Sequence, residues 1–248
     1  MERRVIAVGA GKGGVGKSTV ALDLARALRA HGRVGILDLD FYGPNIPVML
    51  DIEHQRWTRS WILASRSTQQ FVPVIRDDIA IASTGFILGE DQPLGVDAMT
   101  ARLIAKQLVH DVRWPDLAYL VVDLPPGTSA VQHLLVREIQ CAGAIVVVTP
   151  ELVAHLDGRK AVQMFRSLNV RVLGGVENMT ASPCPHCGAG LSPFLPAPSE
   201  RSIWAMGLEK LAEIPLRFDG APGVPGPAAH AAIFDRLAAR VITALDAS

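Results

Sequence analysis

The feature that most constrains this chain is the stretch Gly11-Lys12-Gly13-Gly14-Val15-Gly16-Lys17-Ser18-Thr19, in which a glycine is followed after four residues by Gly-Lys-Ser. An apolar run at residues 5–8 precedes it and predicts a buried strand, and a helical pattern follows it. This strand–loop–helix setting is typical of a phosphate-binding loop. Glycines let successive backbone N–H groups turn toward a polyphosphate, and the following helix adds the partial positive charge of its N-terminus. We therefore predict a nucleotide site on residues 11–19.

Three side chains of this stretch have an expected role at the nucleotide, and a fourth is not required by the motif. Lys17 is expected to bring its charge to the outer phosphates, and the Ser18 hydroxyl is expected to ligate Mg²⁺. Thr19 is placed to donate to the inner phosphate. Lys12 is a second lysine that the minimal motif does not require, and its simplest interpretation is a solvated surface charge.

Composition excludes several classes of protein. The 248 residues are 49% hydrophobic and carry a formal net charge of zero, so no overall field favours binding to nucleic acid or to an anionic membrane. Three cysteines do not make a disulfide framework, which favours a reducing, cytoplasmic location. No apolar run approaches the ~20 residues that span a bilayer. The first four residues lead directly into a strand pattern, so we expect no signal peptide.

Strand and helix patterns alternate along the chain. Apolar runs predict strands at residues 34–37, 79–82, 119–123, 144–148, 170–173 and 211–214, and apolar spacing predicts helices at residues 17–30, 98–112, 153–168 and about 233–245. In the second helix the spacing runs through Leu103, Leu108 and Val112. Uninterrupted apolar strands alternating with helices predict an α/β fold of the P-loop NTPase type, with a mainly parallel, doubly wound sheet that has helices on both faces. We expect residues 1–248 to form a single domain.

The remaining segments are predicted as loops or turns. Residues 41–47 have the composition of a turn-rich loop, residues 174–177 that of a strand followed by a turn, and residues 183–200 and 218–229 are rich in proline and glycine. Trp57 and Trp61 lie four residues apart and are expected to cover the core rather than to bind a partner.

Three acids lie at the ends of predicted strands, where parallel sheets bind ligands: Asp38, Asp40 and Asp123. Asp123 suits a carboxylate of the Mg²⁺ site, and the alternative is an aspartate that only begins a turn. Because side chains alternate along a strand, at most one of Asp38 and Asp40 points directly at the nucleotide. We expect Asp40 to orient the attacking water and Asp38 to lie nearer the metal.

Two further residues are predicted to sense the nucleotide. The backbone N–H of Gly127 is the expected contact to the γ-phosphate, because glycine allows the closest approach of the loop, and its loss on hydrolysis would release the loop. Asn178 is placed to hydrogen-bond a purine edge. A guanine-specific loop would have an aspartate three residues later, where this chain has Ala181, so adenine is the expected base.

The segment Cys184-Pro185-His186-Cys187 is the second chemical feature. Two thiolates at this spacing can hold one side of a metal ion or cluster, but a closed zinc or iron–sulfur site needs about four ligands. Cys141 lies in an apolar stretch and is expected to be a buried small hydrophobe. One chain is thus two ligands short, and a symmetric dimer would supply four. A thioredoxin-type redox pair, a zinc knuckle and a chance pairing remain as alternatives.

The residues together resemble a known family. The segment from Lys12 to Thr19 is similar to the deviant Walker A motif of the MinD/ParA group of P-loop ATPases. The Mrp/ApbC/Nbp35 branch of this group is indicated by Asp38-Leu39-Asp40-Phe41-Tyr42-Gly43-Pro44-Asn45-Ile46-Pro47, Asp123-Leu124-Pro125-Pro126-Gly127-Thr128, Val176-Glu177-Asn178-Met179, Cys184-Pro185-His186-Cys187-Gly188 and Ile214-Pro215-Leu216. The similarity extends over nearly the whole chain.

The resemblance implies a cytoplasmic ATPase that couples ATP hydrolysis to the transfer of iron–sulfur clusters. It implies a homodimer in which Lys12 reaches the partner's nucleotide and a [4Fe–4S] cluster is bridged by Cys184 and Cys187 of both chains. It further implies the cofactors ATP and Mg²⁺, and a nucleotide site that includes Pro215. Its implied partners are recipient apo iron–sulfur proteins and a cluster-assembly scaffold, with no nucleic acid and no membrane.

The chain departs from the family pattern in three places. Ser129-Ala130 replaces the usual Gly-Asp, residues 191–196 replace a glycine-rich segment, and a small N-terminal domain of many bacterial members is not in the sequence. A competing function is a positioning or partition ATPase that binds DNA or membrane as an ATP dimer. That function would require a basic patch or a basic amphipathic tail, and neither is evident in the sequence.

Overall fold

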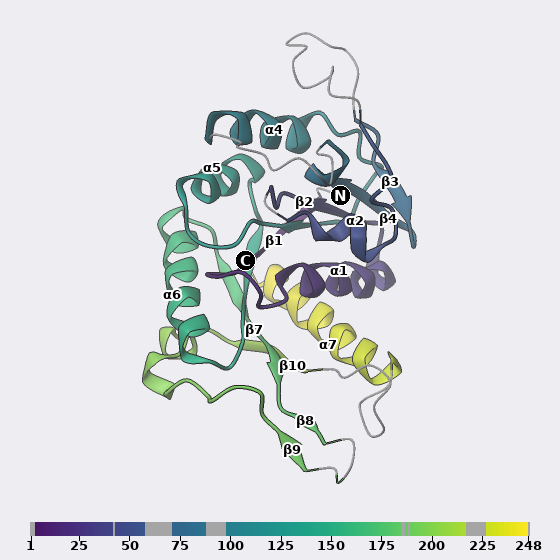
Figure 1. Ribbon diagram of the computed structural model, residues 1–248. Coiled ribbons are helices and arrows are strands. Elements are labelled where there is room, and N and C mark those ends of the chain that lie inside the picture. Colours follow the sequence, from purple (N-terminus) through teal and green to yellow (C-terminus); the bar gives the residue numbers. More distant parts are fainter. Residues whose placement is uncertain are drawn as a thin grey trace.

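The computed structural model describes residues 3–41, 43–57, 71–87, 98–184, 187, 189–216 and 227–247. Its main sheet contains β1 (Arg4–Gly9), β2 (Val34–Asp38), β3 (Val74–Arg76), β4 (Ile79–Ser83), β5 (Tyr119–Asp123), β6 (Gly143–Val148), β7 (Val172–Thr180) and β10 (Lys210–Pro215). The strand order is β10-β7-β6-β1-β5-β2-β4-β3, and every neighbouring pair is parallel except β3–β4 (Figure 1). The predicted mainly parallel sheet is confirmed.

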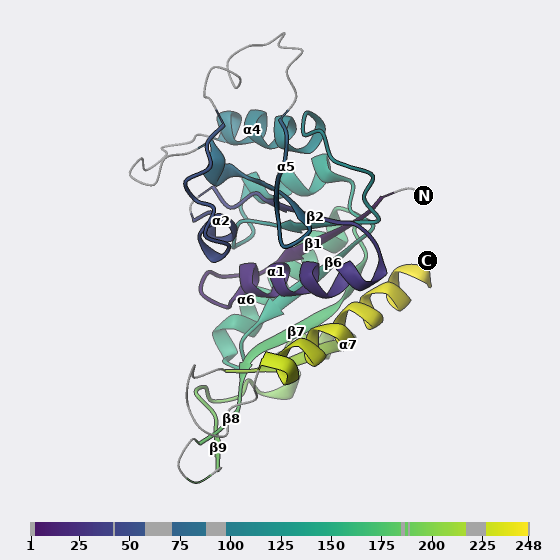
Figure 2. The same ribbon diagram turned by 90° about the vertical axis from the view of Figure 1, so that its right-hand side faces the viewer.

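Helices cover both faces of this sheet (Figures 1 and 2). One face carries α1 (Lys17–Leu28), α2 (Asn45–Met49) and α7 (Pro227–Asp246), and α1 packs against both of the others. The other face carries α4 (Ala98–His110), α5 (Ala130–Ile139) and α6 (Leu152–Ser167). Strands β2, β5 and β6 are buried at every residue, as expected for strands covered on both sides.

The chain winds outward from β1 in two directions, which places a crevice at the carboxyl end of this strand. From β1 it passes through α1 to β2 on one side, and from β5 it passes through α5 to β6 on the other. Ligands of such sheets bind at the point where the strand order reverses. The register also pairs Asp38 of β2 with Asp123 of β5, so two acids lie side by side at this edge.

Strand β7 corrects the prediction of a turn at residues 174–177. The strand continues through both glycines between β6 and β10, with an irregularity of register on each side. A Cβ atom at Gly175 would lie 2.6 Å from the ring of Trp204 and 2.8 Å from Ile203. The glycine therefore serves close packing within the strand, and a turn prediction based on composition alone was wrong.

The prediction of a loop over residues 41–47 is also wrong at its end, because Asn45–Met49 forms α2. Pro47 is the third residue of this helix, within the first turn, where a backbone amide has no partner inside the helix and its absence costs little. In α4 the core is contacted by Ile104 and Leu108, whereas Leu103 is 55% exposed and Val112 lies beyond the end of the helix.

Several other segments differ from the sequence predictions or extend them. Helix α5 and the edge strand β3 have no counterpart among the predicted elements. Helix α7 begins at Pro227, inside the predicted loop at residues 218–229, and residues 217–226 lie outside the described part of the chain.

Trp57 packs against Phe71 and Phe86, with ring centroids 4.8 and 5.3 Å apart, as expected of a residue that covers the core. Trp61 lies outside the described residues.

Candidate nucleotide site and cysteine hairpin

The glycine-rich loop connects β1 to α1 at the crevice, and two of its glycines are required by close contacts. A Cβ atom at Gly11 would lie 2.0 Å from the backbone of Asp157, and one at Gly16 would lie 2.2 Å from the side-chain nitrogen of Asn178. Gly16 also has a φ of +81°, a left-handed conformation that glycine adopts without strain. The backbone amides at the start of α1 therefore face the crevice, where an anion can be bound.

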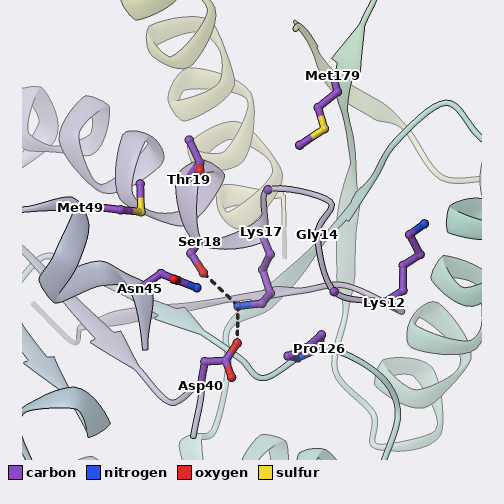
Figure 3. A pocket seen from close by; sticks show the side chains of 12 residues that line it. Lys12, Gly14, Lys17, Ser18, Thr19, Asp40, Asn45, Met49, Pro126 and Met179 are labelled. Atoms are coloured by element: carbon purple, nitrogen blue, oxygen red, sulfur yellow. Dashed lines mark hydrogen bonds and ion pairs between the residues drawn. The ribbon is translucent and has the colours of Figure 1, made fainter. Parts of the chain in front are cut away.

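A cavity of about 360 Å³ opens in front of this loop (Figure 3). Its wall comprises loop and helix residues between Lys12 and Thr19, together with Asp40, Asn45, Met49, Pro126 and Met179. The loop thus contributes the phosphate end of the cavity, while α2 and β7 contribute its two apolar sulfur-containing side chains.

Lys17 lies among carboxylates at the base of the cavity. Its Nζ is 2.5 Å from Asp123 Oδ1. The same atom is 3.6 Å from Asp40 Oδ2 and 3.3 Å from Ser18 Oγ (Figure 3). Lys17 is only 6% exposed and Asp123 is fully buried. The Lys17 ammonium therefore balances the buried negative charge of Asp123 at the base of the cavity.

Asp123 has the features of a metal-site carboxylate. Burial raises its pKa, while the charge and hydrogen bond of Lys17 act in the opposite direction. Its Oδ2 is buried and has no hydrogen-bond partner among the described residues. A buried carboxylate oxygen without a partner costs free energy unless a cation or donor reaches it. Asp123 and the nearby Ser18 hydroxyl therefore suit a Mg²⁺ ion, which prefers oxygen ligands.

Asp38 and Asp40 lie in different surroundings. Asp38 accepts hydrogen bonds from the backbone N–H of Asp40 at 3.0 Å, the Ser83 hydroxyl at 3.0 Å and the backbone N–H of Ile46 at 3.3 Å. Burial, together with the charge of Asp123, raises the pKa of Asp38 to about 8. Asp38 is fully buried behind the cavity, whereas Asp40 lines it. The structure thus separates the two acids, with Asp38 fixing the loop that presents Asp40.

Lys12 forms an ion pair with Glu151, which directly precedes α6. The two side chains are 32% and 31% exposed. Lys12 therefore lines the cavity as one member of a charge pair and not as an isolated surface charge. Nothing in the spacing of the sequence indicated Glu151, which lies 139 residues from Lys12.

The loop after β5 is held against the phosphate-binding loop. The Gly127 N–H, predicted to contact the γ-phosphate, donates to the Ala10 carbonyl at 2.9 Å, and Gly127 has a φ of +98°. The buried side chain of Gln132 donates to the Pro125 carbonyl. In this structure a γ-phosphate contact therefore requires exchange of the Ala10 bond, and Gln132 is a residue that the sequence analysis missed.

Asn178 and Met179 reach the site from the end of β7. The Asn178 side-chain Nδ2 donates to the Val15 carbonyl at 2.9 Å, so the predicted base-reading amide supports the glycine-rich loop. Met179 lines the cavity and was also missed by the sequence analysis. Pro215 ends β10 opposite Thr180 and is not among the residues that line the cavity.

The cysteine pair lies on a hairpin that projects from the body of the molecule beyond β7 (Figures 1 and 2). Strands β8 (Ser182–Pro183) and β9 (Gly190–Leu191) are antiparallel, and the Cys184 N–H donates to the Ala189 carbonyl at 2.7 Å. Cys184 is half-buried and Cys187 is exposed. His186 lies outside the described residues.

The described residues place no third histidine, cysteine, aspartate or glutamate ligand beside the two hairpin cysteines. Among those residues, no group of three or more histidine, cysteine, aspartate or glutamate side chains could hold a metal ion. Cys141 lies two residues before β6, at the amino end of the parallel strands and thus away from the carboxyl end of β7, and burial raises its pKa to about 12. The hairpin therefore contributes two thiols, and the remaining ligands of a metal or cluster site would have to come from elsewhere.

No helix within the described ranges has both the length and the apolar character needed to cross a membrane.

The fold and the loop define a P-loop nucleotide-binding protein. Residues 2–223 match the family model described as ParA, NUBPL iron-transfer P-loop NTPase. The chain belongs to this family, which confirms the resemblance that its motifs indicated.

Relatives with known names agree with this assignment. The chain is 41% identical over 218 residues to the iron–sulfur cluster carrier protein of Pseudomonas fragi, covering 88% of this chain and 74% of the relative. It is 41% identical over 212 residues to the protein of that name in Escherichia coli K12, covering 85% and 53%. It is 38% identical over 217 residues to the mouse iron–sulfur cluster transfer protein NUBPL, covering 86% and 66%. The chain thus spans about half the length of the Escherichia coli relative.

Solved structures show the same fold. A nucleotide-binding protein of Archaeoglobus fulgidus in complex with ADP aligns with a TM-score of 0.71 and 30% identity, covering 96% of this chain and 87% of that one. The cell division ATPase MinD of Pyrococcus furiosus aligns with a TM-score of 0.69 and 21% identity, covering 98% and 99%. The second match supports the fold alone.

Proposed function

We propose that this chain is an ATP-dependent carrier of iron–sulfur clusters. The observation that carries the proposal is the presence, on one small fold, of a cavity in front of the glycine-rich loop and a projecting hairpin with two thiols. The names of its relatives, cluster carrier and cluster transfer proteins, agree with this combination. The cargo is a [4Fe–4S] cluster, which recipient apo iron–sulfur proteins accept and an assembly scaffold supplies in the cytoplasm.

Nucleotide binding begins with an exchange of charge partners. Lys17 leaves Asp123 for the outer phosphates, and the backbone amides between Gly13 and Lys17 surround the inner ones. The Ser18 hydroxyl and Asp123 would hold Mg²⁺, which would neutralise charge on the phosphates. Asp40, at the edge of the cavity, is placed to orient the water that attacks the γ-phosphate.

The working unit is a homodimer, because the hairpin supplies only half of a cluster's usual four thiolates. Two hairpins related by a twofold axis bring Cys184 and Cys187 of both chains together. In the same dimer Lys12 exchanges Glu151 for the phosphates of the partner's ATP. The pairing of Lys12 with Glu151 in a single chain supports this exchange, since it keeps the lysine at the rim of the cavity until ATP arrives.

Anaerobic reconstitution with iron and sulfide tests the proposal. We expect a brown dimer with about one cubane cluster per two chains, with four iron and four sulfide ions each. Cys184→Ser and Cys187→Ser should each abolish the colour while nucleotide binding persists. Cys141→Ser is the matched control and should retain the cluster, because Cys141 lies at the amino end of the strands, away from the hairpin. A colourless wild-type protein that still binds ATP would refute the cluster-carrier function.

A further inference from the structure

Both arms of the cysteine hairpin are attached to the glycine-rich loop. The arm that enters the hairpin is the end of β7, where the Asn178 side chain donates to the Val15 carbonyl at 2.9 Å. From Asn178 the chain runs through Met179 and Thr180 to Cys184. Any movement of the loop carbonyl therefore acts on a strand that reaches the first thiol within a few residues.

Met179 interrupts the regular geometry of that strand. Ile214 of β10 pairs with Asn178 and Pro215 pairs with Thr180, so Met179 is a bulge without a partner on β10. Its φ is +57°, a left-handed conformation that is unfavourable for a long side chain. The bulge directs the Met179 side chain into the nucleotide cavity (Figure 3). Bulges of this kind re-aim side chains next to functional sites.

The arm that leaves the hairpin reaches the same loop by a second route. The Ala197 N–H donates to the Pro150 carbonyl at 2.8 Å, and Pro196 forms an antiparallel bridge with Glu151. Glu151 is the partner of Lys12. A nucleotide that draws Lys12 away therefore leaves Glu151, which pairs with Pro196 of this arm, without its counter-charge.

The chain that follows this arm is fixed to the body of the molecule. The Ile203 N–H donates to His155 Nδ1 at 3.2 Å, and Arg159 donates to the Ser202 carbonyl at 2.9 Å. His155 is 1% exposed, and its Nε2 lies 3.3 Å from Glu177. These contacts fix the segment after the hairpin to α6 and β7. A movement of residues at the cavity is therefore expected to move the hairpin and not the segment that follows it.

We propose that Met179 is a positioning residue that couples occupancy of the nucleotide cavity to the geometry and exposure of the hairpin thiols. A nucleotide that fills the cavity displaces the Met179 side chain, the bulge rotates, and the strand leading to Cys184 turns with it. The Pro196–Glu151 bridge is the second connection and responds to Lys12. The inference rests on the nucleotide part of the proposed function and requires no cluster.

The test measures thiol reactivity in the cluster-free protein carrying Cys141→Ser, so that only Cys184 and Cys187 report. The rate of alkylation by iodoacetamide is compared without nucleotide, with Mg·ADP and with a non-hydrolysable ATP analogue, each at a saturating concentration. We expect a nucleotide to change the rate by at least about fivefold, the lower end of ordinary allosteric coupling. Met179→Ala should reduce this change to less than about twofold.

Met49→Ala is the matched control. Met49 lines the same cavity from α2, which packs against α1 and not on either arm of the hairpin as far as the described contacts go. This variant should therefore shorten a side chain in the cavity but keep the change in thiol reactivity. Met179→Gly serves as a second variant, because glycine accepts the left-handed backbone without strain. Nucleotide affinity and cluster loading are measured on each protein.

The outcomes distinguish the coupling from the proposed function. A wild-type protein that binds nucleotide and loads a cluster, yet shows the same alkylation rate with and without nucleotide, overturns the coupling alone. Equal loss of the response in the Met49 and Met179 variants also overturns it, because filling of the cavity would then suffice. A protein that binds no nucleotide overturns both.

Discussion

Replacing Asn178 with alanine separates two roles that this side chain could have. The Asn178 amide donates to the Val15 carbonyl at 2.9 Å, and the two residues are 8% and 1% exposed. Asn178→Ala removes the donor and leaves a buried carbonyl oxygen without its partner, which costs about 1–3 kcal/mol. The glycine-rich loop is expected to relieve this cost by turning the carbonyl toward water.

Because of this relaxation, the loss of the hydrogen bond is expected to lower the affinity for phosphate-containing ligands. A phosphate chain must restore the original loop before it can bind, so the same 1–3 kcal/mol opposes binding, which corresponds to an increase in Kd of about 5- to 150-fold. The penalty acts on the phosphates and is therefore independent of the base. A role in reading adenine would instead weaken ATP alone.

Equilibrium binding of Mg·ATP, Mg·GTP and Mg·tripolyphosphate measures the difference. We expect Asn178→Ala to weaken all three by a similar factor. Asn45→Ala is the control: Asn45 lines the same cavity, but its amide donates to the Gly43 carbonyl, outside the glycine-rich loop. An unchanged Kd for tripolyphosphate, with a weakened Kd for ATP, would refute the supporting role and favour the purine-reading one.

Three further predictions follow from the charge pairs. Lys17→Ala should abolish nucleotide binding in equilibrium dialysis and lower the free energy of unfolding in urea by about 3–5 kcal/mol, because it leaves the buried Asp123 without its cation. Glu151→Gln releases Lys12 from a partly exposed pair worth about 0.2–1 kcal/mol, so with a non-hydrolysable ATP analogue sedimentation should show up to about fivefold more dimer. An unchanged or smaller dimer fraction would contradict this. Burial would raise the pKa of Glu177, but hydrogen bonds from His155 and Lys210 outweigh it and lower the pKa from 4.5 to about 2. The resulting stability, at most ~3 kcal/mol, is present above pH 4.5 and is lost as the pH falls through 2. Urea unfolding at several pH values should show this slope in the wild type and a flatter one in Glu177→Gln.

The features that could be predicted from the sequence are local ones. Apolar runs predicted the central strands because those strands are buried on both faces and need no alternation. The spacing of glycines and Lys17 predicted the phosphate-binding loop because its geometry depends on a few consecutive residues. The turn predicted at residues 174–177 was wrong because Gly175 makes room for Trp204, a neighbour that only the folded chain supplies.

The contacts that control the site depend on the tertiary structure. Lys12 and Glu151 meet across 139 residues, and Asn178 meets Val15 across 163. Asp38 and Asp40 are chemically identical in the sequence. They differ in the structure because Asp38 accepts hydrogen bonds from Ser83 and two backbone amides, whereas Asp40 lines the cavity. No local pattern carries this information, since each contact is set by which strands are neighbours.

The two charge pairs at the loop also set a threshold for ligands. Because Lys12 and Lys17 are already neutralised by Glu151 and Asp123, any anion that enters must outcompete carboxylates covalently fixed at the site. A chloride ion carries a single charge and has no cation of its own to offer the carboxylate that it would displace. Under the proposed function, a polyphosphate with its magnesium would engage Lys17 while the cation would take over Asp123. The carboxylates of Glu151 and Asp123 therefore act against the binding of small anions at these two lysines.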